Sequence, residues 1–276
     1  MQRLITNLTA CYMRRVRRLG FQQIGIHHMK ILLFCPLNPN PPRLWRRTAE
    51  SILKIQWPDP IDYWLTANDN PFDKPYLITH QYNKARDMVL TGGYDALLCV
   101  ESDMIVPLST LARLAACDSD VAYGLYVFRH TRHNWSAYTE MERTWGRSLS
   151  ENQAEARKQW GSVIDVSGVG MGCTLIRRNA LELVKFRLDD DRPDKTSCDW
   201  SFALDVASEG LLQRCDLGVV CGHISYKPYP MILWPDQEEP RLYRRETLEG
   251  VTMTPIKAGD QFHVGMGETI LASANG

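Results

Sequence analysis

Short apolar runs and amphipathic segments alternate along the first half of the chain. Runs of four to eight mainly apolar residues predict strands at 31–35, 61–66, 95–100 and 120–127. Those at 31–35 and 95–100 are nearly continuous, which is typical of parallel strands covered on both faces. Between the runs, helical spacing predicts helices at 41–55, 76–91 and 107–117. This order predicts a Rossmann-like open twisted, mostly parallel α/β sheet flanked by helices.

The regular alternation ends near residue 128. Residues 129–160 are polar, aromatic and basic, with one helix expected at 150–160. Further strands are expected at 163–166, 173–176 and 217–220, and further helices from 179 and over 199–209. We therefore expect a basic extension at 1–29, an α/β domain at 30–226 and a tail at 227–276 that packs on the domain. Within the domain, 129–160 would be an insertion on the acceptor side and 186–198 a candidate lid loop.

Composition narrows the classes of function. The 276 residues carry 32 basic and 32 acidic side chains, so no net charge attracts the chain to nucleic acid or membrane. We find no apolar run near 18 residues, which argues against a membrane span. The eight cysteines include no CxxC pair, and several lie in apolar stretches. This usage is typical of a reduced protein, and we expect a cytoplasmic location.

The first 29 residues form a basic segment. Five arginines precede Met29, and the first acidic residue is Glu50. A transit peptide, a nucleic-acid-binding arm and a membrane-surface helix would all have this composition. We favour an extension outside the core, because Met29-Lys30 followed by a strand is typical of a natural beginning.

Two carboxylates follow the third expected strand directly. In open α/β sheets, ligands bind beyond the carboxyl ends of the strands. Glu101-Ser102-Asp103 therefore places both acids where Mn²⁺ or Mg²⁺ could bind a diphosphate. A solvated turn would show the same acid-x-acid pattern, and its position after the strand favours the metal site.

Three other features contain residues of the kinds found in catalytic, phosphate-binding or zinc sites. Asp199 begins an expected helix, where an acid also stabilises the helix N-terminus. The segment 168–172, GVGMG, misses the dinucleotide pattern, so its glycines are expected to permit close backbone approach. Zinc binding by Cys215, Cys221 and His223 is disfavoured by their spacing.

Six segments, taken in order, resemble the family-2-like glycosyltransferases of the GT-A fold. They are ILLFCP (31–36), NKAR (83–86), LLCVESD (97–103), GVGMGCTLIRR (168–178), DWSF (199–202) and CGHI (221–224). The resemblance covers roughly residues 30–226. It rests on the order and spacing of the six segments, which match those of the family. It implies a hexosyltransferase-like enzyme that moves a sugar from a nucleotide-diphosphate sugar, UDP- or GDP-linked, to an acceptor hydroxyl.

The resemblance also assigns roles to residues. Asp103 and His223 would bind Mn²⁺ or Mg²⁺, and Asp199 would be the general base of an inverting reaction. The residues implied in donor binding are Pro36, Asn38, Asp69, Asn83, Arg86, Glu101, Ser102 and Gly170. On the acceptor side we expect Arg129, His130, Arg132, Trp135 and Trp200. The chain departs from the family pattern at Glu101, which replaces an Asp, and at Cys198, which replaces an acid.

Other functions remain open at this stage. The basic and aromatic residues at 129–138 would suit phosphates and unpaired bases, as in a nucleic-acid-binding protein. A glycosyltransferase acting on modified viral DNA would combine both functions. A sugar nucleotidyltransferase is less favoured, because the segment 36–42 after the first strand contains no glycine. The acceptor, the stereochemistry and the oligomeric state are not determined by the sequence.

Overall fold

The computed structural model describes residues 28–39, 42–66, 74–129, 132–188, 198–225, 230–248, 253–255 and 261–262. Asp69, His130, the extension at 1–27 and most of the candidate lid loop lie outside these ranges. Of Asn38 only the backbone is described.

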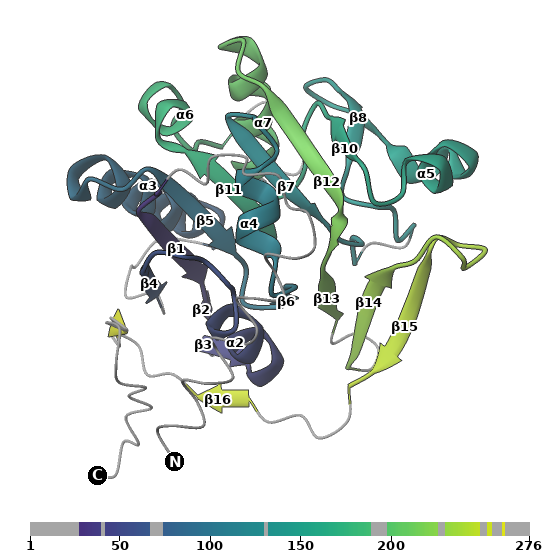
Figure 1. The fold of residues 1–276 in the computed structure, drawn as a ribbon, viewed down its shortest axis with the longest axis horizontal. Coiled ribbons are helices and arrows are strands. Elements are labelled where there is room, and N and C mark those ends of the chain that lie inside the picture. The colour runs from purple at the N-terminus through teal and green to yellow at the C-terminus, as the bar shows by residue number, and fades with distance from the viewer. Residues whose placement is uncertain are drawn as a thin grey trace, which may run out of the picture.

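The centre of the molecule is a twisted sheet to which eight of the described strands belong (Figure 1). In spatial order these are β10 (Val163–Asp165), β12 (Gln213–Val220), β7 (Val121–Leu125), β11 (Cys173–Arg177), β5 (Ala96–Val100), β1 (Ile31–Pro36), β4 (Ile61–Thr66) and β17 (Gln261–Phe262). Strands β1, β4, β5, β7 and β12 run in one direction, and β10, β11 and β17 run against them. The predicted mostly parallel sheet is confirmed.

Helices flank this sheet, as the sequence predicts. They are α2 (Arg46–Leu53), α3 (Lys74–Gly92), α4 (Thr110–Ala115), α6 (Arg178–Leu183) and α7 (Cys198–Ser208). Helix α3 contacts β1, β5, α6 and α7, whereas α4 contacts β7, β11 and β12. Figure 1 shows α3 and α6 near one end of the sheet and α5 (Gln153–Gln159) beyond the other.

The predicted start of the helix at 41–55 is wrong. Pro42–Trp45 forms β3, which pairs with β2 (Asn38–Pro39) and β16 (Met253–Pro255), and α2 begins only at Arg46. Pairing with these two strands keeps the segment extended, and a local pattern does not predict such pairing.

A smaller antiparallel sheet lies beside the main one. Its order is β15 (Tyr243–Thr247), β14 (Met231–Pro235), β13 (Gly222–Ser225) and β6 (Met104–Ile105). Two of these strands come from the tail, and the buried Trp135 ring donates from Nε1 to the carbonyl of Leu242, at 2.7 Å. Residues 231–247 of the tail therefore extend the sheet that carries β6 and β13.

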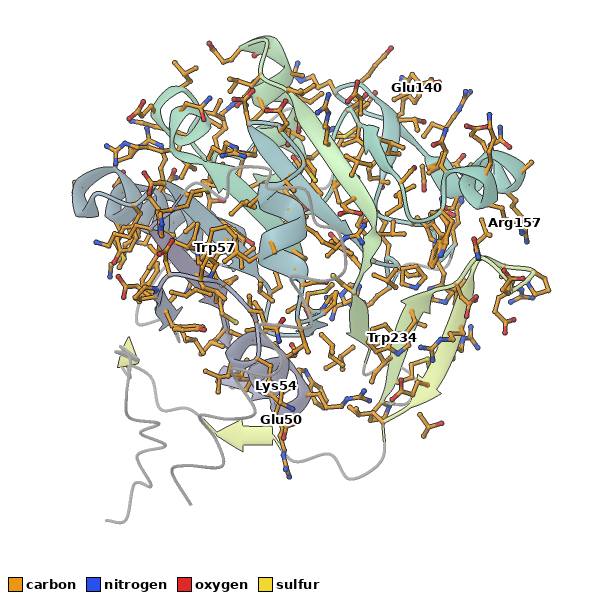
Figure 2. The ribbon with its side chains drawn as sticks, viewed as in Figure 1. Glu50, Lys54, Trp57, Glu140, Arg157 and Trp234 are labelled. Carbon is orange, nitrogen blue, oxygen red and sulfur yellow. The ribbon has the colours of Figure 1, made fainter. Side chains whose placement is uncertain are left out.

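The insertion at 129–160 contains a hairpin that the sequence pattern did not predict. Its strands are β8 (Tyr138–Met141) and β9 (Gly146–Ser148), followed by a 3₁₀ turn at Leu149–Glu151 and the expected helix, α5. Figure 2 shows Arg157 on α5 near the turn between β14 and β15, and its guanidinium donates to the carbonyls of Gln237 and Glu239. The insertion and the tail thus support each other. No helix within the described ranges is both long and apolar enough to cross a membrane.

Candidate functional site

Several of the predicted site residues meet at the carboxyl edge of the parallel strands. Glu101 follows β5 directly, and Val127 follows β7. Because β11 runs against its neighbours, the glycine segment at 168–172 reaches the same edge before this strand. His223 arrives there after β12. Segments far apart in the chain therefore supply one group of side chains.

Asp103 and His223 are held together by the smaller sheet. His223 is paired with Met104 across β13 and β6, and the Ile224 amide donates to the Asp103 carbonyl at 2.8 Å. His223 Nδ1 lies 2.7 Å from the carbonyl oxygen of Val127. A carbonyl only accepts, so Nδ1 carries the proton, and in the neutral ring Nε2 presents a lone pair. Nε2 lies 3.9 Å from Asp103 Oδ1.

This pair suits a divalent cation. Asp103 Oδ1 is buried and accepts no hydrogen bond from any residue the structure describes. A separation of 3.9 Å is too long for a hydrogen bond to Nε2. Carboxylate oxygen and an imidazole nitrogen oriented by a backbone carbonyl are established kinds of metal ligand. The described residues contain no group of three such side chains, so a bound Mn²⁺ or Mg²⁺ would need substrate oxygens and water as its other ligands.

Negative charge accumulates around Asp103. Burial, followed by the charges of Asp103 and Asp199, raises the pKa of Glu101 to about 8. The hydroxyl of Tyr82 lies 3.4 Å from Glu101 Oε1, and the Glu101 amide donates to the carbonyl of Gly172. A pKa of about 8 leaves Glu101 largely protonated at neutral pH, and a cation bound beside it would favour its ionised form.

Arg129 supplies positive charge to this group. Its Nη1 donates to Asp103 Oδ2 at 2.5 Å and lies 3.4 Å from the carbonyl of Ile224. The Arg129 charge also lowers the pKa of Glu101, opposing burial. Arg129 was predicted on the acceptor side, and in the structure it contacts the predicted metal ligand.

Asp199 lies in the first turn of α7, as predicted. Its Oδ1 accepts from the amide of Trp200 at 2.9 Å. Its Oδ2 lies close to Gly170, because a Cβ built on that glycine would be 3.1 Å away. The carboxylate therefore faces the glycine segment, and its role as a base stays a prediction.

The glycine segment makes room for Tyr126. A Cβ on Gly170 would lie 2.2 Å from the Tyr126 hydroxyl oxygen, and one on Gly172 would lie 2.9 Å from the ring. The ring also packs edge-on against His223, with centroids 5.4 Å apart. The close approach expected of these glycines is present, and the group that approaches is a buried tyrosine.

We expect Gly170→Ala to destabilise the fold by about 1–3 kcal/mol, as overpacking does. The added methyl would overlap the hydroxyl of Tyr126, whose side chain is buried. In Gly170→Ala/Tyr126→Phe the nearest ring atom would be Cζ, 3.5 Å away, which is ordinary contact. Chemical denaturation of both variants checks this, and a double variant no more stable than Gly170→Ala would contradict it.

Two predicted donor residues contact the protein itself. Asn83 Nδ2 donates to the Phe186 carbonyl at 2.7 Å and its Oδ1 accepts from the Phe186 amide at 3.1 Å. Arg86 Nε donates to the Val184 carbonyl at 3.1 Å, and Arg86 is largely buried. Asn83 thus ties α3 to the start of the candidate lid loop, and Arg86 ties it to the end of α6. Contact with a donor stays a prediction for each.

The remaining predicted residues differ in exposure. Pro36 and Ser102 are buried. Trp135 is fully buried and packs on Trp160, so its ring is not available to an acceptor in this structure. Trp200 is half-buried, and Arg132 is exposed. Trp200 packs edge-on against Tyr138 and donates from Nε1 to the carbonyl of Glu142, which ties the start of α7 to the β8–β9 hairpin.

Sequence reasoning missed two contributors to the site. Tyr126 lies in a run predicted as a strand, and Val127 acts through its backbone carbonyl, so neither side chain signalled a role. The pairing of Arg129 with Asp103 was also missed, although both residues had been singled out. The one signal in the sequence was that each residue follows a predicted strand, and these strands end at the same edge of the sheet.

Solved structures resemble this chain over most of its length. A197 from STIV has 18% sequence identity and a TM-score of 0.53, and the match covers 84% of this chain and 100% of A197. The two chains share a fold. TarS from S. aureus in complex with UDP matches with 15% identity and a TM-score of 0.42, over 68% of this chain and 57% of that one. GalNAc-T7 with UDP, GalNAc and Mn²⁺ matches with 10% identity and a TM-score of 0.45, over 73% and 45%.

The likeness to A197 concerns fold only, at this level of identity. No family model and no curated protein matches the sequence.

Proposed function

We propose that this chain is a divalent-metal-dependent glycosyltransferase of the GT-A type. It would move a sugar from a nucleotide-diphosphate sugar to an acceptor hydroxyl. The observation that carries the proposal is the Asp103–His223 pair at the carboxyl edge of the parallel strands, with Oδ1 and Nε2 3.9 Å apart. This is the edge where open α/β sheets bind ligands, and where the resemblance to GT-A enzymes puts the donor diphosphate.

Each side chain of the site has a distinct task in this proposal. A cation held by Asp103 and His223 would neutralise charge on the leaving diphosphate. The Val127 carbonyl keeps the His223 ring in one orientation and one tautomer. Asp199 would take the proton of the acceptor hydroxyl as its oxygen attacks the anomeric carbon, which inverts the configuration. Glu101 would contact the ribose of the donor.

The acceptor would lie beside the start of α7. The rings of Trp200 and Tyr138 are 5.3 Å apart, and those of Tyr138 and Phe128 are 5.7 Å apart. Half-buried aromatic rings of this kind pack on sugar faces and also stack on bases. A sugar acceptor and a modified nucleic acid would both suit this group. The basic residues at 129–138 support a nucleic-acid acceptor less strongly, because Arg129 is paired with Asp103 and so is not presented to phosphates.

A thermal-shift screen tests the proposed function. UDP-, GDP-, CMP- and dTDP-sugars are each added with Mn²⁺ and, separately, with EDTA. We expect one donor to raise the melting temperature by several degrees with Mn²⁺ only, because a ligand at a hundred times its Kd stabilises the folded state by about 2.7 kcal/mol. If no donor changes the melting temperature under either condition, the proposal fails.

A further inference from the structure

Arg129 occupies the carboxylate that the proposed cation needs. Its Nη1 donates to Asp103 Oδ2 at 2.5 Å, with the Asp103 side chain only 15% exposed and that of Arg129 34% exposed. This is a charge-assisted hydrogen bond, and such bonds are about twice as strong as neutral ones. The other oxygen, Oδ1, faces His223 and accepts no hydrogen bond from the described part of the chain.

The same Asp103 carboxylate cannot serve two cations equally well. A divalent ion on Oδ1 would place its charge within a few ångströms of the Arg129 guanidinium, and the two would repel in a partly buried place. Arg129 also has a second contact, since Nη1 lies 3.4 Å from the Ile224 carbonyl. The guanidinium could therefore leave the carboxylate and still keep a hydrogen-bond acceptor nearby.

We propose that Arg129 is an internal counter-ion of Asp103, which a divalent cation displaces when it binds. Arg129 thereby weakens the binding of the metal and neutralises the acidic group in its absence. The inference rests on the proposed function, because it takes Asp103 and His223 as the metal ligands. It concerns the metal alone, so it can be tested without a donor.

The experiment is a Mn²⁺ titration of the full chain without nucleotide, followed by the electron paramagnetic resonance signal of free Mn²⁺. We expect Arg129→Gln to bind Mn²⁺ about tenfold more tightly than the wild type, because the competing charge is gone. Arg129→Lys keeps the charge and should stay near the wild-type affinity. Asp103→Asn should remove binding in both the wild-type and the Arg129→Gln backgrounds.

Arg46→Gln is the matched control. It removes one positive charge from an exposed pair with Glu50 on α2, so it should leave the Mn²⁺ affinity unchanged. Melting temperatures establish that each variant is folded. Unchanged or weaker Mn²⁺ binding by Arg129→Gln would overturn the inference, and so would the absence of Mn²⁺ binding by every variant.

Donor binding separates this inference from the proposed function. If a nucleotide sugar stabilises the wild type in EDTA and Arg129→Gln loses that stabilisation, Arg129 serves the donor phosphates in place of a metal. That result overturns the displacement by metal and the metal dependence, and it leaves the transfer of a sugar from a nucleotide donor standing. If no nucleotide sugar stabilises either protein, with or without Mn²⁺, it is the proposed function that fails.

Discussion

Replacing Asp103 with Asn is expected to lower sugar transfer at least a hundredfold. Asn has the shape of Asp without its negative charge. It would therefore not hold the divalent ion that neutralises the leaving diphosphate. Losing one electrostatic contact to the transition state typically costs about 10²–10³ in turnover. The measurement is release of nucleoside diphosphate from the donor identified by thermal shift, at saturating Mn²⁺. Loss of the Mn²⁺-dependent shift should accompany the loss of turnover.

Two further Asp→Asn variants make this result specific. Asp165 is 72% exposed and pairs with Arg214 on the far edge of the sheet, so Asp165→Asn should leave turnover unchanged. Asp199→Asn should keep the donor-dependent shift with Mn²⁺ and lose turnover by about 10²–10⁴, as expected when a general base is removed. Full turnover in Asp103→Asn would remove the metal role from Asp103, and full turnover in Asp199→Asn would remove the base.

Arg113→Met is expected to cause the largest loss of stability. Arg113 on α4 donates from Nε and Nη2 to the two oxygens of Asp216, at 2.8 and 2.6 Å. The Asp216 side chain is only 3% exposed, whereas that of Arg113 is 40% exposed. Removing one partner of a buried pair typically costs about 3–5 kcal/mol. We expect about 3 kcal/mol, because water can partly replace an arginine that is this exposed.

Chemical denaturation measures this loss, and two variants test its cause. Arg187 and Asp205 form the same two-bond geometry, with both distances at 2.7 Å, but their side chains are 52% and 27% exposed. Arg187→Met should cost at most about 1 kcal/mol. Arg113→Met/Asp216→Leu should recover part of the loss, because no unpaired charge stays buried. Equal losses at the two arginines would show that burial of Asp216 is not the cause.

Local pattern was sufficient for much of the fold. The apolar runs located β1, β4, β5 and β7, and helical spacing located α3, because each element buries residues at its own period. Prediction from the local pattern failed where pairing with another segment decides the conformation. Pro42–Trp45 is extended because β2 and β16 pair with it, and the β8–β9 hairpin forms within a segment that is mostly polar.

The site shows the same division. Glu101, Ser102 and Asp103 could be singled out because they follow an apolar strand, and open sheets bind ligands at that edge. The partners of Asp103 could not be predicted. Arg129 is 26 residues away, and the carbonyl that orients His223 is 96 residues from that ring. Asn83 and Arg86 donate to backbone carbonyls about a hundred residues later in the chain. The spacing of residues within one segment cannot predict contacts of this kind.

The sequence by itself therefore determined the alternation of strands and helices, the mostly parallel sheet and the position of the acidic pair at its edge. These follow from periodicity and from the end of an apolar run, which are local properties. Three contacts depend instead on the assembled fold: Arg129 pairs with Asp103, Tyr126 occupies the space left by Gly170, and His223 presents Nε2 to the carboxylate. Those contacts join segments that meet only when the sheet has formed, and both their distances and their burial depend on how the whole chain packs.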